Sequence, residues 1–133
     1  MAALLKSRTV SVPIHCDPRT VYAFVSNPEN LPKWATTFCR SVTQSNGAWI
    51  IDTVQGPMNV RFARQNDVGV LDHYLTPSPG VEVFVPMRVV PNGQGCEMLF
   101  TLFQQPDMSD DTYAKDAESV AQDLNTLKRL LEA

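Results

Sequence analysis

The stretch VSVPIHCDPRTVYAFVSNPENLPKW, residues 10–34, carries the signals that decide the fold. Apolar and polar residues alternate over residues 8–15, which predicts a half-buried strand. Asp17-Pro18 follows at once and offers an N-cap carboxylate with proline at the first helical position. Asn27-Pro28 repeats this arrangement, and Pro32 limits the second helix to a turn or two. We therefore expect a first strand followed by two short helices that meet end to end.

Turn signals divide the next part of the chain, residues 40–104, into short extended segments. They lie at Asn46-Gly47, Gln55-Gly56, 65–69, 77–80 and Asn92-Gly93. Short apolar runs between regularly spaced turns are typical of an antiparallel meander. Six strands fit this part of the chain.

The last part of the chain has a different period, because its apolar residues step by three and four, which predicts one long helix. Ser109 can cap this helix, with Asp110 in its first turn and Lys128 in its last, which suits the helix dipole at both ends. The order of elements is α+β. A curved antiparallel sheet of seven strands can then wrap the long C-terminal helix, with two short helices after the first strand.

Length, composition and charge narrow the class of protein. The 133 residues, 44% of them hydrophobic, fit a single domain over residues 1–133. A net charge of −3 is the wrong sign for a nucleic-acid partner. No apolar run approaches the roughly 20 residues of a membrane-spanning helix, and the first ten residues do not resemble a secretory signal, so we expect a cytoplasmic protein. Three widely spaced cysteines indicate neither a disulfide framework nor a zinc site.

The sequence resembles the START-like superfamily, also called the SRPBCC or birch-pollen-allergen fold, and within it the polyketide cyclase/dehydrase-like group. The resemblance rests on residues 10–34 quoted above, on the meander and on the closing helix, and covers nearly the whole chain. It implies a helix-grip fold with a cavity for a hydrophobic ligand between the sheet and the long helix. Some members of the superfamily also use this cavity for catalysis.

Two tight turns set which side chains would share a face, because a slip of one residue reverses every side chain. A turn at Asn92-Gly93 predicts the apolar pairs Val89 with Cys96, Met87 with Met98 and Val85 with Phe100. It also predicts a solvated salt bridge between Arg88 and Glu97 on the outer face. A turn at Gln55-Gly56 predicts a second apolar face, with the pairs Thr53–Met58, Ile51–Val60 and Trp49–Phe62.

His73 is the candidate functional side chain. The strand that contains it can face the cavity either with His73 and its apolar neighbours or with Asp72. Burying an ionised aspartate would cost several kcal/mol more than burying a neutral imidazole. We therefore place His73 inward, as a general acid or base or a ligand-orienting group. A structural histidine bonded to Tyr113, a carbonyl or a water is the reading we favour over catalysis.

The remaining candidate ligand contacts are the side chains that this arrangement turns toward the cavity. They are Trp49, Ile51, Phe62, Leu71, Val85, Met87, Met98 and Phe100 on the sheet, and Tyr113, Ala117, Val120 and Leu124 on the helix. Trp34 either closes the cavity mouth or fastens the short helices to the sheet.

Several kinds of chemistry have no motif in the chain. The two histidines and three cysteines show no metal-ligand spacing, so we expect no metal. The nucleophile elbow, the phosphate loop and the dinucleotide-binding glycine motif are all missing, and we expect no cofactor.

Three functions remain. The first is binding of a small hydrophobic or aromatic metabolite, of lipid or polyketide type, by a monomer or homodimer. The second is a cyclase/dehydrase-like enzyme with His73 as general acid or base and Tyr22, Tyr74 or Tyr113 as helper. The third, by resemblance to relatives that regulate a chaperone, is a protein-interaction module.

Overall fold

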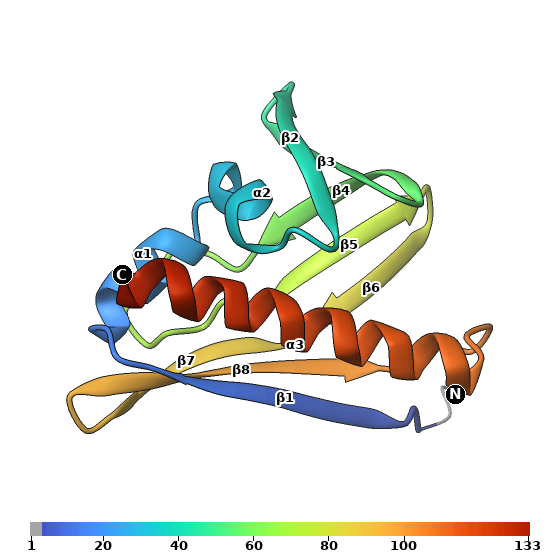
Figure 1. Cartoon of the computed structure of the whole chain (residues 1–133). Helices are drawn as coiled ribbons and strands as arrows, with labels where there is room; N and C mark the ends of the chain where they lie inside the picture. Colours follow the sequence, from blue (N-terminus) through green and yellow to red (C-terminus); the bar gives the residue numbers. More distant parts are fainter. Residues whose placement is uncertain (1–3) are drawn as a thin grey trace.

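The computed structural model describes residues 4–133. Residues 1–3, part of the opening segment in which we expect no secretory signal, lie outside this range. The elements in chain order are β1 (Ser7–Ile14), α1 (Pro18–Val25), the 3-10 turn η1 (Pro28–Asn30), α2 (Leu31–Trp34), β2 (Cys39–Ser45), β3 (Ala48–Thr53), β4 (Gly56–Phe62), β5 (His73–Ser78), β6 (Val81–Val85), β7 (Met87–Asn92), β8 (Gly95–Phe103) and α3 (Asp110–Glu132) (Figure 1).

The predicted helix starts are confirmed by their caps. The Asp17 carboxylate accepts the Arg19 backbone N–H at 2.8 Å, and the Asn27 amide oxygen accepts that of Glu29 at 3.1 Å. Ser109 Oγ accepts the Thr112 N–H at 3.1 Å at the start of α3. Each side chain satisfies a donor that the helix itself leaves unpaired.

The strands form two antiparallel sheets, one in the order β1-β8-β7 and one in the order β2-β3-β4-β5-β6. The expected helix-grip architecture is therefore present, but with eight strands in place of seven. The extra strand arises at Pro86, because a proline cannot donate to a ladder. The chain changes partner there: Val85 pairs with His73 in the larger sheet, and Met87 pairs with Phe100 in the smaller one.

The two predicted hairpin registers are wrong, because each chain reversal is centred one residue away from the expected position. Thr53 pairs with Gly56, so Val54 and Gln55 form the turn, and Ile51 opposes Met58 rather than Val60. The Thr53 hydroxyl holds this turn, since it donates to the Gly56 carbonyl at 2.7 Å and accepts the Gln55 N–H at 3.1 Å.

The second hairpin is shifted in the same way. Asn92 pairs with Gly95, so Met87 opposes Phe100 and Arg88 opposes Leu99. The predicted Arg88–Glu97 salt bridge is therefore absent. Each partner moves by two positions, an even step, so every side chain keeps its predicted face.

Arg88 instead takes part in a line of hydrogen bonds that joins the two sheets, which we call the seam. The segment before β5 runs beside β7: Leu71 N–H donates to the Met87 carbonyl at 2.8 Å, and Val89 N–H donates to the Gly69 carbonyl at 2.9 Å. The Asp72 carboxylate accepts the Met87 N–H at 2.9 Å and pairs with the Arg88 guanidinium at 3.1 Å. These bonds make one curved surface from the two sheets.

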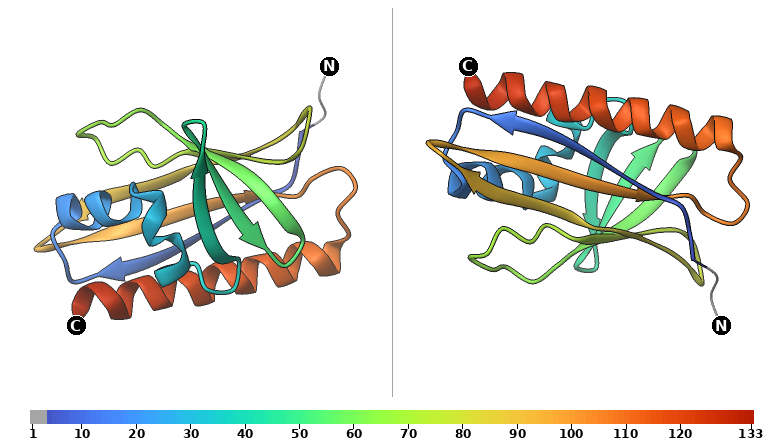
Figure 2. Two further views of the ribbon diagram at one scale, coloured as in Figure 1. Left: turned by 90° about the horizontal axis from the view of Figure 1, so that it is seen from above. Right: turned by 90° about the horizontal axis from the view of Figure 1, so that it is seen from below.

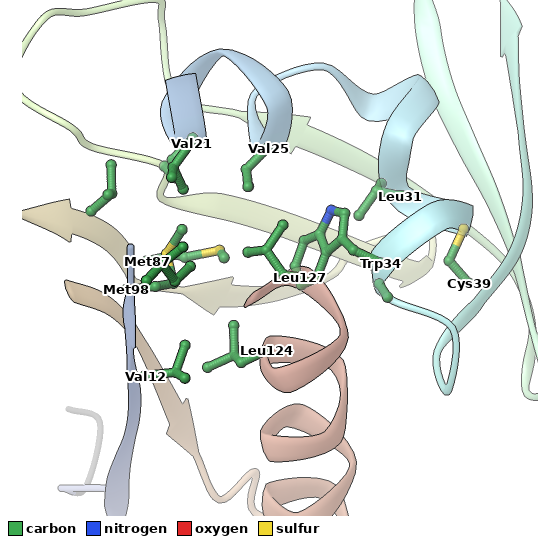
Figure 3. Packing of buried hydrophobic residues seen from close by; sticks show 14 of the residues in the cluster. Val12, Val21, Val25, Leu31, Trp34, Cys39, Met87, Met98, Leu124 and Leu127 are labelled. Atoms are coloured by element: carbon green, nitrogen blue, oxygen red, sulfur yellow. The ribbon is translucent and has the colours of Figure 1, made fainter. Parts of the chain in front are cut away.

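Helix α3 lies against this curved surface. It crosses the front of Figure 1, with β1, β7 and β8 below it and β2–β6 above, and it runs along one side of both sheets in Figure 2. Its apolar stripe packs beside β1. One end of the space between helix and sheets is solidly filled, by Val12, Val21, Val25, Met87, Met98, Leu124 and Leu127 (Figure 3).

Candidate functional site

The other end of that space holds a cavity of about 350 Å³. It is bounded by α2 and the loop after it, by the larger sheet, by the end of β8 and by the N-terminal half of α3. Most of its wall is apolar, and six aromatic side chains border it: Trp34, Phe38, Phe62, Phe84, Phe100 and Phe103. Concave, mostly apolar sites with a few placed polar groups are typical of small-molecule binding.

The structure places some of the predicted contact residues on this wall and others elsewhere. On the wall are Trp34, Ile51, Phe62, His73, Val85, Phe100 and Val120. Buried outside the wall are Leu71, Met87, Met98, Tyr113, Ala117 and Leu124. Trp49 lines a separate shallow hollow beside Pro32 and Arg40.

The rotation of α3 explains why the helix residues differ from those expected. Its most buried apolar side chains, Leu124 and Leu127, lie in the closed end of the core. The cavity instead meets the flank about a quarter turn away. That flank consists of Asp116, Ser119, Val120 and Asp123. Val120 was expected on this wall. Asp116, Ser119 and Asp123 share its spacing of three and four residues, but their polar side chains spoke against an inward face.

His73 faces the cavity from the start of β5, and Asp72 faces the other side of the strand. The His73 ring lies 4.9 Å from the Phe62 ring and 6.1 Å from the Phe100 ring, measured between centroids. Its Nδ1 lies 3.1 Å from the Leu71 carbonyl oxygen. Because a carbonyl only accepts, Nδ1 carries the proton and Nε2 keeps a free lone pair. Burial lowers the pKa of His73, with the Leu71 carbonyl and Asp72 opposing this effect, so the ring is neutral at pH 7.

Two carboxylates lie on the α3 wall. Asp123 is only 5% exposed, and it accepts the Thr37 N–H at 3.0 Å and the Thr37 hydroxyl at 2.8 Å. These bonds fasten the loop after α2 to α3. Asp116 has no hydrogen bond or ion pair to the rest of the described chain. Burial raises the pKa of both carboxyl groups.

Trp34 belongs both to the wall and to the buried cluster with Leu31 and Leu127 (Figure 3). The side chain is 4% exposed, so it fastens α2 to the core rather than covering an open mouth. Its Nε1–H is buried and finds no hydrogen-bond acceptor among residues 4–133. An unpaired buried donor costs free energy, which the apolar contacts of the ring in this cluster must offset.

The remaining reactive groups do not converge on the cavity. Burial raises the pKa of the Cys39 and Cys96 thiols to about 11, so both are protonated at pH 7. Within residues 4–133, no cluster of three or more His, Cys, Asp or Glu side chains has the geometry to hold a metal ion. Among the helices of residues 4–133, none combines the length and the hydropathy that a membrane span requires.

Fold and cavity together define a helix-grip protein with a mostly apolar internal site. The chain belongs to the family described as polyketide cyclase / dehydrase and lipid transport, whose model matches residues 7–132. The expected START-like (SRPBCC) superfamily is thereby confirmed.

Solved structures of the same fold share little sequence with the chain. The protein XoxI from Bacillus cereus is 16% identical with a TM-score of 0.77, and the match covers 96% of each chain. The Aha1 dimer from Colwellia psychrerythraea is 12% identical with a TM-score of 0.76, covering 96% of this chain and 97% of that one. Ara h 8.0201 is 11% identical with a TM-score of 0.70, covering 96% and 98%. No curated protein sequence matches the chain.

Proposed function

We propose that the protein binds a small hydrophobic or aromatic molecule in the cavity between the larger sheet and α3. The observation that carries this proposal is the cavity itself, about 350 Å³ in volume and walled mainly by aliphatic and aromatic side chains. The volume lies within the usual range of ligand sites. Family membership supports the same function, since the family description includes lipid transport.

A pair of tryptophan substitutions on α3 tests this proposal. Val120 lines the cavity, whereas Glu118 is exposed on the same helix. Val120→Trp should fill the cavity and abolish binding of a hydrophobic fluorescent dye, because the added ring takes the space of the ligand. Glu118→Trp should bind the dye like the wild type. Equal dye binding by all three proteins would show that the dye binds elsewhere and would contradict the proposal.

An enzymatic role for His73 is the second candidate. The bond from Nδ1 to the Leu71 carbonyl fixes the tautomer, and the neutral ring presents Nε2 as a base. The three helper tyrosines, however, have other partners. Tyr22 donates to Gln65 at 3.1 Å, Tyr113 donates to the Leu102 carbonyl at 2.8 Å, and Tyr74 stacks with Phe84. Binding therefore has the stronger support.

A comparison of metabolite extracts separates the two candidates. Wild-type protein and His73→Phe are each incubated with a small-molecule extract of the source cells, and the products are analysed by mass spectrometry. An enzyme should convert a compound that the variant leaves unchanged. A binding protein should retain a compound without converting it.

We also propose that the protein works in the cytoplasm as a monomer or homodimer. The acidic net charge of −3 speaks against nucleic acid as a partner. Sedimentation of the purified chain would decide between the two oligomeric states.

A further inference from the structure

We propose that the molecule bound in this cavity is a flat aromatic compound that is uncharged at neutral pH and carries at least one hydroxyl group. This inference rests on the proposed function and specifies the ligand chemistry. It separates hydroxylated aromatic compounds from carboxylate-bearing lipids such as fatty acids. The argument comes from the polar atoms of the wall, which we divide into hydrogen-bond donors and acceptors.

The first free acceptor is Nε2 of His73. The proton sits on Nδ1, which the Leu71 carbonyl occupies at 3.1 Å, so Nε2 can only accept. No side chain or backbone group in the described part of the chain bonds to it. A ligand that reaches this ring therefore gains a hydrogen bond if it brings an O–H group.

The second free acceptor is the carboxylate of Asp116. It lines the cavity and has no hydrogen-bond or salt-bridge partner within residues 4–133. Asp123 adds a further negative charge to the same wall, although Thr37 already occupies its oxygens. An O–H group on the ligand can satisfy Asp116, whereas an anionic group would be repelled by both carboxylates.

The wall has no positively charged group that could stabilise an anion. None of its residues is a lysine or arginine, and its one imidazole is neutral. Several side-chain donors are already in use. The Thr53 hydroxyl donates to the Gly56 carbonyl at 2.7 Å, and the Gln105 amide donates to the Phe103 carbonyl at 3.3 Å.

Three donors on the wall have no partner among residues 4–133: the Ser119 hydroxyl, the Gln55 amide and the Trp34 Nε1–H, the last of which is too buried for a ligand to reach. Without a cation, such donors leave a buried carboxylate strongly disfavoured, because it would lie beside Asp116 and Asp123.

The aromatic side chains indicate a flat ligand. Phe62 and Phe100 flank the His73 ring at centroid distances of 4.9 and 6.1 Å. A planar ring placed against these faces gains stacking contacts that a flexible acyl chain does not. An aromatic hydroxyl group would then lie in the plane of its ring and reach the edge of the imidazole.

Three naphthalene probes test the inference: 2-naphthol, its ether 2-methoxynaphthalene, and 2-naphthoate. The ether cannot donate a hydrogen bond, and the carboxylate is anionic at neutral pH. Affinities are measured by competition with a fluorescent dye, for the wild type and for variants whose folding is checked by circular dichroism. For each protein we take the ratio of two probe affinities and compare this ratio between the wild type and the variant, so that differences in hydrophobicity between the probes cancel.

Two variants have distinct expected results. His73→Phe keeps the aromatic contacts but removes the acceptor, so the affinity ratio of naphthol to its ether should fall about threefold to tenfold. Asp116→Asn removes a negative charge and adds a donor, so naphthoate should gain at least about threefold relative to naphthol. Asp111→Asn, on the exposed side of α3, should leave both ratios unchanged.

The outcomes separate this inference from the function on which it rests. If either ratio stays constant in its variant while Val120→Trp still excludes the probes, the cavity binds hydrophobic molecules and the inference is wrong. If no probe binds the wild type better than Val120→Trp, the proposed function fails and the inference fails with it. Should His73→Phe not fold, His73→Leu replaces it for the same ratio.

Discussion

The neutral imidazole of His73 makes the stability of the protein depend on pH. Burial lowers its pKa in the folded state below the ordinary value of 6.5. The unfolded chain therefore binds a proton more readily as the pH falls from about 6.5 toward the folded pKa. We expect the folded state to lose stability over this range, by at most about 1.4 kcal/mol per pH unit for one group.

Urea unfolding of the wild type and His73→Phe at several pH values checks this prediction. The variant lacks the titrating ring, so its free energy of unfolding should fall less steeply below pH 6.5. His15→Gln is the control, because His15 is exposed at the end of β1. Parallel curves for wild type and His73→Phe would show that the ring is not buried as neutral imidazole.

The contact between Thr37 and Asp123 gives a second prediction at a single residue. The Thr37 hydroxyl donates to the buried Asp123 carboxylate at 2.8 Å. Thr37→Val keeps the shape of the side chain and removes that bond, so the free energy of unfolding should fall by about 1 to 2 kcal/mol. Thr43→Val, at an exposed position of β2, should change it little. Equal effects of the two substitutions in urea unfolding would contradict a specific contact with Asp123.

The sequence predicts the position of a single side chain where local energetics decide it. The inward position of His73 follows from the choice between burying an imidazole and burying the Asp72 carboxylate, and the structure has this arrangement. The positions of Asp116 and Asp123 depend on how α3 is rotated about its axis. The period of the helix fixes which residues share a face, but not which neighbouring element that face meets.

The seam between the sheets is the feature to test among the elements. Gly69 has φ of +74°, and a Cβ there would overlap the Val89 carbonyl oxygen, which lies in the adjoining β7. Gly69→Ala should therefore cost about 3 kcal/mol or more, because both a disfavoured backbone conformation and a backbone clash are involved.

Gly80 provides a matched control for this substitution. Its φ is +81°, but a Cβ there meets no atom within 4 Å. Gly80→Ala should cost only about 1 kcal/mol, the price of the left-handed conformation alone. Thermal or urea unfolding gives the stability of both variants. If Gly69→Ala is no less stable than Gly80→Ala, the backbone at the seam can shift at little cost in free energy.

The sequence predicts elements better than their pairing. Helix caps and alternation depend on neighbouring residues, so β1, α1 and α3 begin and end close to the expected positions. The registers depend on where each turn is centred, which for Val54-Gln55 is decided by the hydroxyl of Thr53. The division at Pro86 also needs the second sheet, because only there does the strand find its new partner, Phe100.

For the molecule as a whole, the sequence predicts that helix and sheet enclose a space, but not which end of it is filled. Met87 and Met98 were candidate ligand contacts and are fully buried in the closed end (Figure 3). Apolar side chains are equally suited to a core and to a cavity wall. Whether such a side chain lies in the core or on the cavity wall depends on the distance between α3 and each sheet. The curvature of the whole β surface sets this distance.

A bound ligand should stabilise the entire fold, because the cavity exists only when helix and sheets are assembled. Binding to the folded state alone adds about 2.7 kcal/mol to the free energy of unfolding when the free ligand is at 100 times its dissociation constant. Urea unfolding of the wild type should show this gain with 2-naphthol at that excess. Val120→Trp should show none at the same concentration, since its ring occupies the site, while Glu118→Trp should gain as much as the wild type. An equal gain in Val120→Trp would mean that naphthol stabilises the protein from another site.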